Sequence, residues 1–235
     1  MEPTTAPRPA PRTTVVQVGG LRLQGWAAIV ALLAILGAIV ALIVWRGLPR
    51  WPVLASGVLW VFFITYWSAA AKHAGPTKSS ESSESRRTHV RLMNAALVLL
   101  FIPSFWLLGR RFVPDGLAAV VAGLSIQIVA GALGVWARRH LGRNWSGAIA
   151  VAEEHELVRT GPYGMLRHPI YSAMIGMFVG SALAIGEWHS VVGFVLITVA
   201  YARKIPLEER SLGATFGPAY DDYRKASWAL IPWVF

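Results

Sequence analysis

Six uncharged stretches of 15 to 22 residues divide this chain and restrict what it can fold into. A helix needs about 20 apolar residues to cross the hydrocarbon core of a bilayer, with a range of roughly 17–25. The last two stretches are marginal in length for a membrane span, and only Glu187 and its neighbours separate them, so we expect them to form a tight helical hairpin. The six stretches are 26–45, 51–71, 92–109, 116–137, 169–186 and 188–202.

The composition supports an integral membrane protein. Hydrophobic residues make up 55% of the 235 positions and charged residues only 14%, whereas soluble domains carry about 25% charged residues. The net charge of +10 is high, but nucleic-acid-binding domains are not this apolar, so we expect no nucleic-acid partner. The chain has no cysteine, which excludes disulfides, thiol nucleophiles and thiolate zinc sites.

The distribution of basic residues predicts the orientation in the membrane. If all six stretches span it with the N-terminus inside, 18 of the 22 Lys and Arg residues lie on the inner side. This asymmetry is what the positive-inside rule requires of cytoplasmic segments. The sequence therefore predicts an all-α integral membrane protein with about six transmembrane helices and with both termini in the cytoplasm.

Composition also divides the chain into three regions. Residues 1–22 are rich in Pro, Thr and Arg, which predicts a disordered tail. Residues 23–137 form a membrane region of four helices, in which 72–91 is a flexible Ser-rich polar loop. Residues 138–235 contain almost all the acidic and histidine side chains with a possible role in chemistry.

Two charged clusters in the third region are expected to meet. The first lies in 138–171, where Gly161-Pro162 predicts a turn and Pro169 suits the first turn of a helix. The second follows the hairpin on a helix expected to end at Pro206, and it contains Arg203, Lys204 and the pair Glu208-Glu209. Because a helical hairpin returns the chain to its starting side, both clusters face one cytoplasmic site.

Each of these residues also has a structural interpretation. His155 and His168 fit interfacial histidines, Arg167 fits a lipid-headgroup anchor, and the Glu pair fits a solvated helix end. No nucleotide-binding glycine motif and no HExxH motif is present, so no metal site is expected. A proton-coupled transporter usually needs an ionisable residue within a membrane span. Outside the hairpin turn no predicted span contains a carboxylate, so this function is disfavoured.

The segment HELVRTGPYGMLRHPIY at 155–171 closely resembles the signature of the isoprenylcysteine carboxyl methyltransferase family and its phospholipid-methyltransferase relatives. The family pattern continues with a Glu pair one hairpin later, then Phe-Gly-x-x-Tyr-x-x-Tyr and a closing Ile-Pro. This chain supplies these elements in order at 208–209, 216–223 and 231–232. The resemblance covers 138–235 and implies a membrane methyltransferase that uses S-adenosylmethionine without a Rossmann domain.

The resemblance also implies the site residues. On the acceptor side the family has a basic residue before the Glu pair, for which Arg203 and Lys204 are the candidates, with Arg203 preferred because a guanidinium can hold a carboxylate bidentately. Arg167 is a third catalytic candidate. The cofactor contacts of the family fall on His155, Leu157, Val158, Tyr163, His168, Pro169, Tyr171 and Glu208.

Several functions remain open at this point. The resemblance implies methyl transfer to an isoprenylcysteine carboxylate or another lipid or prenylated small-molecule acceptor, at a site that faces the cytoplasm. An NADPH-dependent enzyme like the sterol reductases is the alternative enzyme, and a non-enzymatic scaffold or lipid-binding protein is the alternative of another class. The oligomeric state and the acceptor's chemical type, carboxylate, amine or thiol, do not follow from the sequence.

Overall fold

A computed structural model describes residues 15–18, 21–24, 51–71, 78–79, 81–102, 106–146, 150–151 and 156–233. The chain divides into two units, residues 1–49 and residues 50–235. In the first unit, strands β1 (Val15–Val18) and β2 (Leu21–Gln24) pair antiparallel, with Val15 opposite Gln24. The predicted span 26–45 and the rest of the predicted tail 1–22 lie outside the described residues.

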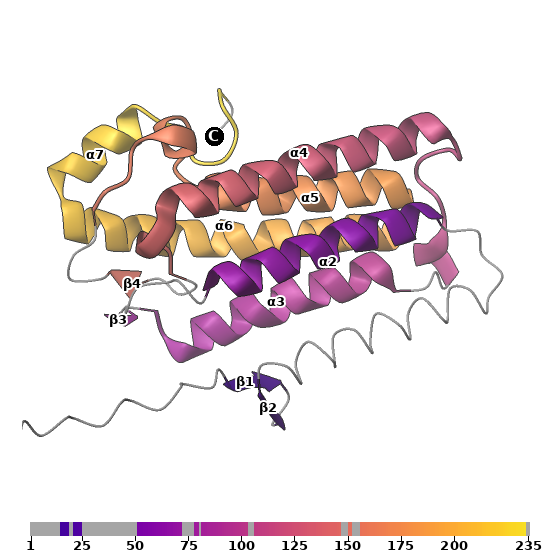
Figure 1. The fold of residues 1–235 in the computed structure, drawn as a ribbon, viewed down its shortest axis with the longest axis horizontal. Coiled ribbons are helices and arrows are strands. Elements are labelled where there is room, and N and C mark those ends of the chain that lie inside the picture. The colour runs from indigo at the N-terminus through magenta and orange to yellow at the C-terminus, as the bar shows by residue number, and fades with distance from the viewer. Residues whose placement is uncertain are drawn as a thin grey trace, which may run out of the picture. The chain divides into compact units, whose positions relative to one another are not determined.

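The second unit is a helical bundle, which confirms the predicted helical class (Figure 1). A two-residue pairing of β3 (Lys78–Ser79) with β4 (Ala150–Val151) is its only sheet within the described ranges. Short 3-10 turns cover Trp106–Gly109 (η1), Gly142–Asn144 (η2) and Gly161–Gly164 (η3). The helices are α2 (Trp51–Ala71), α3 (Ser83–Phe101), α4 (Leu117–Leu141), α5 (Pro169–Ile185), α6 (Trp188–Phe216) and α7 (Pro218–Lys225).

Three of these helices, α2, α4 and α6, are long and apolar enough to cross a membrane. The helix α5 is apolar but has only 17 residues. The helix α3 differs from the predicted span 92–109, because it begins at Ser83 and ends at Phe101. Ser82 caps its first turn by accepting a hydrogen bond from the Ser85 amide at 3.2 Å, so half of the predicted flexible loop 72–91 is helical.

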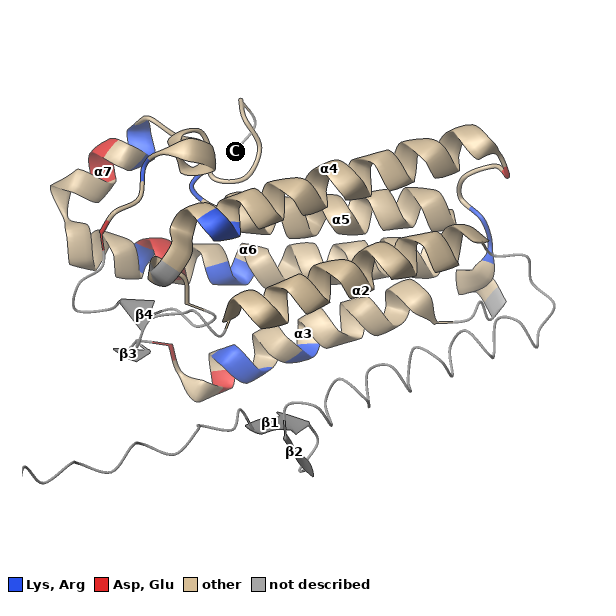
Figure 2. Cartoon of the chain, in the orientation of Figure 1, with Lys and Arg blue, Asp and Glu red and all other residues tan. Residues whose placement is uncertain are grey.

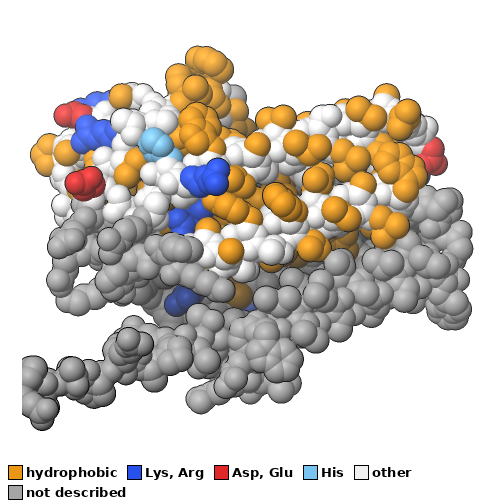
Figure 3. Space-filling view, viewed as in Figure 1, with side chains coloured by type: hydrophobic (Ala, Val, Ile, Leu, Met, Phe, Trp, Pro, Cys, Tyr) orange, Lys and Arg blue, Asp and Glu red, His pale blue; other side chains and the backbone are white. Residues whose placement is uncertain are grey.

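The outer faces of the bundle carry apolar side chains. Phe62 on α2 is 73% exposed and Val129 on α4 is 69% exposed, as expected of helix faces that contact lipid. Figure 3 shows hydrophobic side chains along the face formed by α2 and α4, and charged side chains near α7. In Figure 2 the charged positions likewise lie mainly at the end of the bundle that contains α7 and the start of α3.

The helices α4 and α5 pack closely because glycines line their contact. A Cβ on Gly123 would lie 2.5 Å from the backbone nitrogen of Ala184, and one on Gly180 would lie 2.5 Å from the Gly123 carbonyl oxygen. A Cβ on Gly176 would lie 2.9 Å from the Cβ of Ala130. The spacing of Gly176 and Gly180 on one face of α5 therefore allows the two helices to pack closely.

Buried hydroxyl and amide groups join α2, α4 and α5 inside the bundle. Ser181 accepts hydrogen bonds from Ser56 and from the Trp60 indole, both at 3.0 Å. Gln127 donates to the backbone carbonyl of Ser56 at 3.0 Å. Hydrogen bonds of this kind hold helices together where lipid provides no hydrophobic drive for association.

The helices α5 and α6 form the predicted hairpin. Gly186 ends α5 in the left-handed region at φ +73°, and α6 begins two residues later. The turn is fixed from within, because His189 contacts the buried Glu187 carboxylate at 3.1 Å and the Leu99 carbonyl at 2.7 Å. The hairpin returns the chain to the end of the bundle where α5 begins.

The prediction that the last helix ends at Pro206 is wrong, since α6 continues through Pro206 to Phe216. A proline inside a helix removes one backbone donor and typically costs about 3 kcal/mol. Residues after Pro206 pack against α7 and form the ion pairs described below, and these contacts offset the cost. The continuation extends α6 beyond its apolar part and carries the Glu pair to the site.

Candidate active site

A glycine-dependent turn precedes the site. Gly161 has φ +59°, and a Cβ there would lie 2.7 Å from the imidazole of His140. That imidazole is held 2.8 Å from the Thr160 hydroxyl and stacks on the Tyr163 ring. The predicted turn at Gly161-Pro162 is confirmed, and Pro169 is the first residue of α5, as expected.

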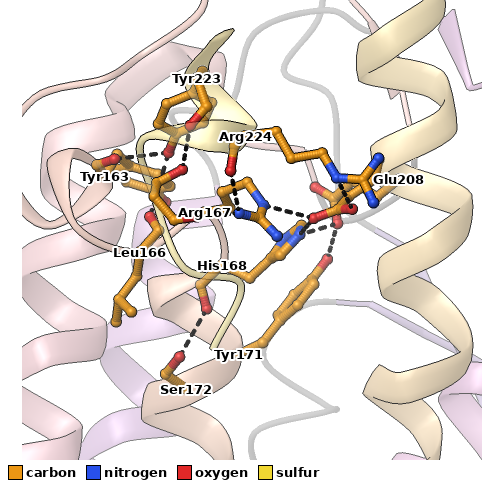
Figure 4. Close-up of polar contacts among 11 residues, drawn as sticks. Tyr163, Leu166, Arg167, His168, Tyr171, Ser172, Glu208, Tyr223 and Arg224 are labelled. Atoms are coloured by element: carbon orange, nitrogen blue, oxygen red, sulfur yellow. Dashed lines mark hydrogen bonds and ion pairs between the residues drawn. The ribbon is translucent and has the colours of Figure 1, made fainter. Parts of the chain in front are cut away.

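The C-terminal segment after α7 fixes the backbone of the Arg-His-Pro motif. The amides of Arg167 and His168 donate to the carbonyls of Trp228 and Ala229, at 2.8 and 3.0 Å. The Tyr223 hydroxyl of α7 donates to the Tyr163 carbonyl at 2.7 Å (Figure 4). The motif is therefore held between α5 and residues that lie about 60 positions later in the chain.

Glu209 lies at the centre of the polar contacts. Its carboxylate accepts a hydrogen bond from Arg167 Nε at 2.8 Å and lies 3.3 Å from His168 Nε2. Arg224 Nε approaches the second carboxylate oxygen at 3.7 Å. The Glu209 side chain is 13% exposed, so its charge is stabilised by neighbouring cationic and imidazole groups more than by water. This confirms that the two charged clusters meet.

Arg167, the third catalytic candidate, is held by several contacts within the protein. Its guanidinium contacts Glu209 and also donates to the backbone carbonyls of Arg224 and Ser227. The side chain is 11% exposed. These contacts bind α6 to the C-terminal segment.

Glu208 points in another direction from its neighbour, because consecutive residues on a helix lie about 100° apart. Its carboxylate accepts a hydrogen bond from the Tyr171 hydroxyl and lies 3.9 Å from His168 Nδ1 (Figure 4). The side chain is 31% exposed. Glu208 therefore keeps acceptor capacity for a ligand, while the more buried Glu209 is committed to the protein framework.

Aromatic rings form a row beside these carboxylates. The His168 and Tyr171 rings are parallel, with centroids 5.3 Å apart, and Tyr171 stacks on Tyr201 of α6 at 4.4 Å. Lys204 is buried, and its Nζ lies 5.8 Å from the centre of the Tyr171 ring. Tyrosine faces attract cations, which is consistent with the position of the lysine beside this ring.

The structure reverses the order expected for the two basic candidates on α6. Lys204 is 8% exposed and faces Tyr171, whereas Arg203 is exposed. Guanidinium geometry alone favoured Arg203. The packing of α6 against α5 leaves Arg203 exposed and places Lys204 beside Tyr171. The residue directed to the site is Lys204.

An apolar base supports the motif. Tyr163, Ile170 and Ala137 are buried together, with Val158 and Trp145 packed against them. Pro169 is fully buried and Leu157 is half-buried. Val158 therefore packs against this buried cluster, and Pro169 is buried at the start of α5. Leu157 precedes Val158 in the chain. His155, a predicted cofactor contact, lies outside the described residues.

Burial keeps the phenols of the site protonated. Burial, and then the nearby charge of Glu208, raises the pKa of Tyr163 well above its usual value. Burial likewise raises the pKa of Tyr223 to about 12, against the opposing effect of Arg167. Both hydroxyls are therefore hydrogen-bond donors at neutral pH. Within the described ranges, no group of three or more His, Asp or Glu side chains is placed to hold a metal ion.

Glu209 was expected in a charged cluster at the site but without a role of its own, and Tyr201 and His89 were not predicted there. Glu209 adjoins a predicted residue, and helical spacing from Lys204 places Tyr201 on the same face of α6. His89 had no such signal, because it lies in α3, far from the motif in sequence. Its ring packs against that of Tyr201, with centroids 5.4 Å apart.

Comparison with known proteins finds several that are similar to this chain in sequence. Residues 122–214 match the model of the isoprenylcysteine carboxyl methyltransferase (ICMT) family. A probable protein-S-isoprenylcysteine O-methyltransferase from Oryza sativa subsp. indica is 27% identical over 180 residues, which cover 72% of this chain and 88% of that protein. Protein-S-isoprenylcysteine O-methyltransferase B from Arabidopsis thaliana is 31% identical over 115 residues, or 48% of this chain and 58% of that protein.

A solved structure, that of the eukaryotic intramembrane Ras methyltransferase ICMT, is also similar, with a TM-score of 0.49 and 22% identity. The match covers 63% of this chain and 53% of that one, so the chain spans about half the length of the solved protein it matches. The family match at 122–214 includes the Arg-His-Pro motif, the helical hairpin and the Glu pair. This part of the chain is therefore similar to the isoprenylcysteine carboxyl methyltransferase family.

Proposed function

We propose that this protein is an S-adenosylmethionine-dependent methyltransferase that acts on the carboxylate of an isoprenylcysteine-like acceptor in the membrane. The family match and the named methyltransferases among its relatives support methyl transfer. The observation that carries the proposal is the contact between Tyr171 and Glu208, because it joins the two motif elements that the family has in common.

The residues of the site fit this methyl donor. S-adenosylmethionine supplies an activated methyl group on a positively charged sulfur. Tyrosine rings lie beside Glu208, that of Tyr171 in direct contact with it, and aromatic rings bind a sulfonium by cation–π attraction. Glu208 is partly exposed and can accept hydrogen bonds from ribose hydroxyls or an amino group. His168, Tyr163 and the apolar base of Val158 and Pro169 would complete the binding surface.

The reaction needs little proton chemistry from the protein. One carboxylate oxygen forms a bond to the methyl carbon, the carbon–sulfur bond breaks, and its electron pair stays on the sulfur. A carboxylate is already ionised at neutral pH, so no general base is required. Catalysis then consists mainly of alignment and exclusion of water. Lys204, buried beside Tyr171, is the group that would orient the anionic acceptor.

We also infer that the site faces the cytoplasm. The basic segments 203–235 and 138–168, which contribute most of the site, are those that the positive-inside rule assigns to the inner side. The acceptor's isoprenoid chain would enter from the bilayer, past the exposed apolar faces of the bundle. This arrangement predicts a membrane-bound acceptor rather than a soluble one.

The test uses the purified full chain in lipid nanodiscs with methyl-tritiated S-adenosylmethionine and N-acetyl-S-farnesylcysteine. A methyl ester is labile to base, so the label should be released as volatile methanol after alkaline treatment. Glu208→Gln serves as the site variant and the exposed Asp222→Asn as its control. Label that is absent, or stable to base, would refute carboxyl methylation, and NADPH competition for binding would favour the reductase alternative.

A further inference from the structure

His89 places a hydrogen-bonding atom without a partner beside the site. It lies in the charged first half of α3, before the apolar segment that begins at Leu92. Its Nδ1 is buried and has no hydrogen-bond partner among the described residues. The ring makes a hydrogen bond with the backbone of Ala200, and this contact falls to Nε2 because Nδ1 is unpaired.

The surroundings of His89 keep it neutral. Burial lowers its pKa, and the positive charge of Lys204 and, more weakly, that of Arg203 act in the same direction, against the Ala200 contact and Glu81. In the neutral ring the nitrogen that faces the Ala200 carbonyl carries the hydrogen. Nδ1 therefore presents a lone pair, which makes it a hydrogen-bond acceptor.

The position of this acceptor relates it to the proposed reaction. The His89 ring packs edge-on against Tyr201, which stacks on Tyr171 at 4.4 Å. Lys204 Nζ lies 5.8 Å from the Tyr171 ring. A cation and a lone pair thus flank the same pair of tyrosines, and Glu208 and His168 contact Tyr171 at the other end of the row of rings.

We propose that His89 Nδ1 accepts a hydrogen bond from the amide N–H next to the acceptor's carboxylate, while Lys204 contacts that carboxylate. The two groups together would recognise an N-acylated amino acid with a free carboxylate, which is the chemistry of a chain's C-terminal residue. A buried polar atom without a partner is unfavourable in the free protein, and the amide would satisfy it. The inference rests on the proposed methyl transfer, and it assigns His89 as a specificity-determining residue of the acceptor.

The experiment compares two acceptors that differ only in the group that His89 would bind. N-acetyl-S-farnesylcysteine has the amide N–H, and 3-(farnesylthio)propionic acid has the same chain and carboxylate without the acetamido group. The ratio of kcat/KM for the two acceptors is measured with saturating S-adenosylmethionine. We expect the wild type to favour the amide, and His89→Phe to lower the ratio about 2- to 10-fold, as for loss of one neutral hydrogen bond.

Two further variants separate hydrogen bonding from packing. His89→Asn places its carbonyl oxygen at the position of Nδ1 and should keep the ratio near that of the wild type. His89→Gln places its amide at the position of Nε2 and should lower the ratio as Phe does. Val90→Ala, at a neighbouring side chain that is 41% exposed, is the control for changes in α3. Calorimetric binding of S-adenosylmethionine checks that each variant is folded.

The outcomes distinguish this inference from the proposed function. If the wild type methylates both acceptors and no His89 variant changes the ratio, the role of His89 is refuted and the methyltransferase stands. The same holds if Asn and Gln lower the ratio equally, because that result indicates packing. If the wild type methylates neither acceptor, the proposed function fails, and the assignment of His89 fails with it.

Discussion

Tyr171 donates a hydrogen bond to Glu208 across the contact between α5 and α6, although the two residues lie 37 positions apart. The contact exists because the α5–α6 hairpin brings the start of one helix beside the later part of the other. It also divides the Glu pair by function. Glu208 is held by Tyr171 and remains partly exposed, while Glu209 is surrounded by Arg167, His168 and Arg224.

Glu208→Gln should weaken binding of S-adenosylmethionine by about 10- to 100-fold, the effect of losing a charge-assisted hydrogen bond. The amide oxygen can still accept from Tyr171, so the melting temperature should stay close to that of the wild type. Isothermal titration calorimetry in detergent measures the affinity. Equal affinity in variant and wild type would show that Glu208 does not contact the cofactor.

Glu209→Gln should strongly lower the stability of the folded protein, whereas Glu208→Gln should leave the melting temperature nearly unchanged. The substitution leaves Arg167 without its buried anionic partner, and removing one member of a buried ion pair typically costs about 3 kcal/mol or more. Thermal unfolding of the two Glu variants side by side is the measurement, each variant serving as the control for the other. The division of roles is wrong if the Glu209 variant melts at the wild-type temperature.

Lys204→Gln should lower turnover of a carboxylate acceptor by about 10- to 100-fold, because a charge-assisted contact is lost. Binding of S-adenosylmethionine should be unchanged, since the lysine faces Tyr171 from the acceptor side in the proposed arrangement. The matched control is Arg203→Gln on the exposed face of the same helix. If Arg203→Gln lowers turnover and Lys204→Gln does not, then Arg203 is the residue that contacts the acceptor, as the sequence predicted.

Gly180→Ala should destabilise the bundle. The added Cβ would lie 2.5 Å from the Gly123 carbonyl oxygen, and backbone atoms of a packed helix cannot move aside as a flexible side chain can. Overpacking of this kind typically costs about 1–3 kcal/mol. Gly116→Ala is the control, because no atom lies within 4 Å of its added Cβ. Equal melting temperatures for the two variants would contradict the close packing of α4 and α5.

The membrane orientation can be tested in this cysteine-free chain with single cysteines. Cysteines at Glu84 and Asp222 should react with an impermeant maleimide from the cytoplasmic side, and a cysteine at Asp115 from the other side. All three positions are exposed in the structure. Labelling of positions 84 and 222 from opposite sides would refute the predicted topology.

The sequence predicted the hairpin, the turn at Gly161 and the meeting of the two charged clusters. These features depend on local rules: Pro at a helix start, Gly at positive φ, and the return of the chain by a helical hairpin. The motif resemblance added Glu208 and Tyr171, which the structure places in contact. Such features are visible in sequence because they need particular residue types at fixed spacing.

Other features could not be predicted from the sequence, because they depend on contacts between residues that are far apart in the chain. The length of α6 was mispredicted because Pro206 is tolerated only through contacts of Glu209 and α7 with distant residues. Lys204 and Arg203 are adjacent in sequence, and only the packing of α6 against α5 decides which one faces Tyr171. His89 joins the site through the contact of α3 with α6, and α3 lies outside the matched family region.

The pairing of Arg167 and His168 with Trp228 and Ala229 has a consequence for biosynthesis. A ribosome adds residues in order and encloses the newest part of the chain in its exit tunnel. The helices of the bundle can enter the bilayer while Trp228 and Ala229 are still enclosed, but the motif lacks its backbone partners until they emerge. The site is thus completed only after α5, α6 and α7 have been synthesised, because its partners follow all three helices in the chain.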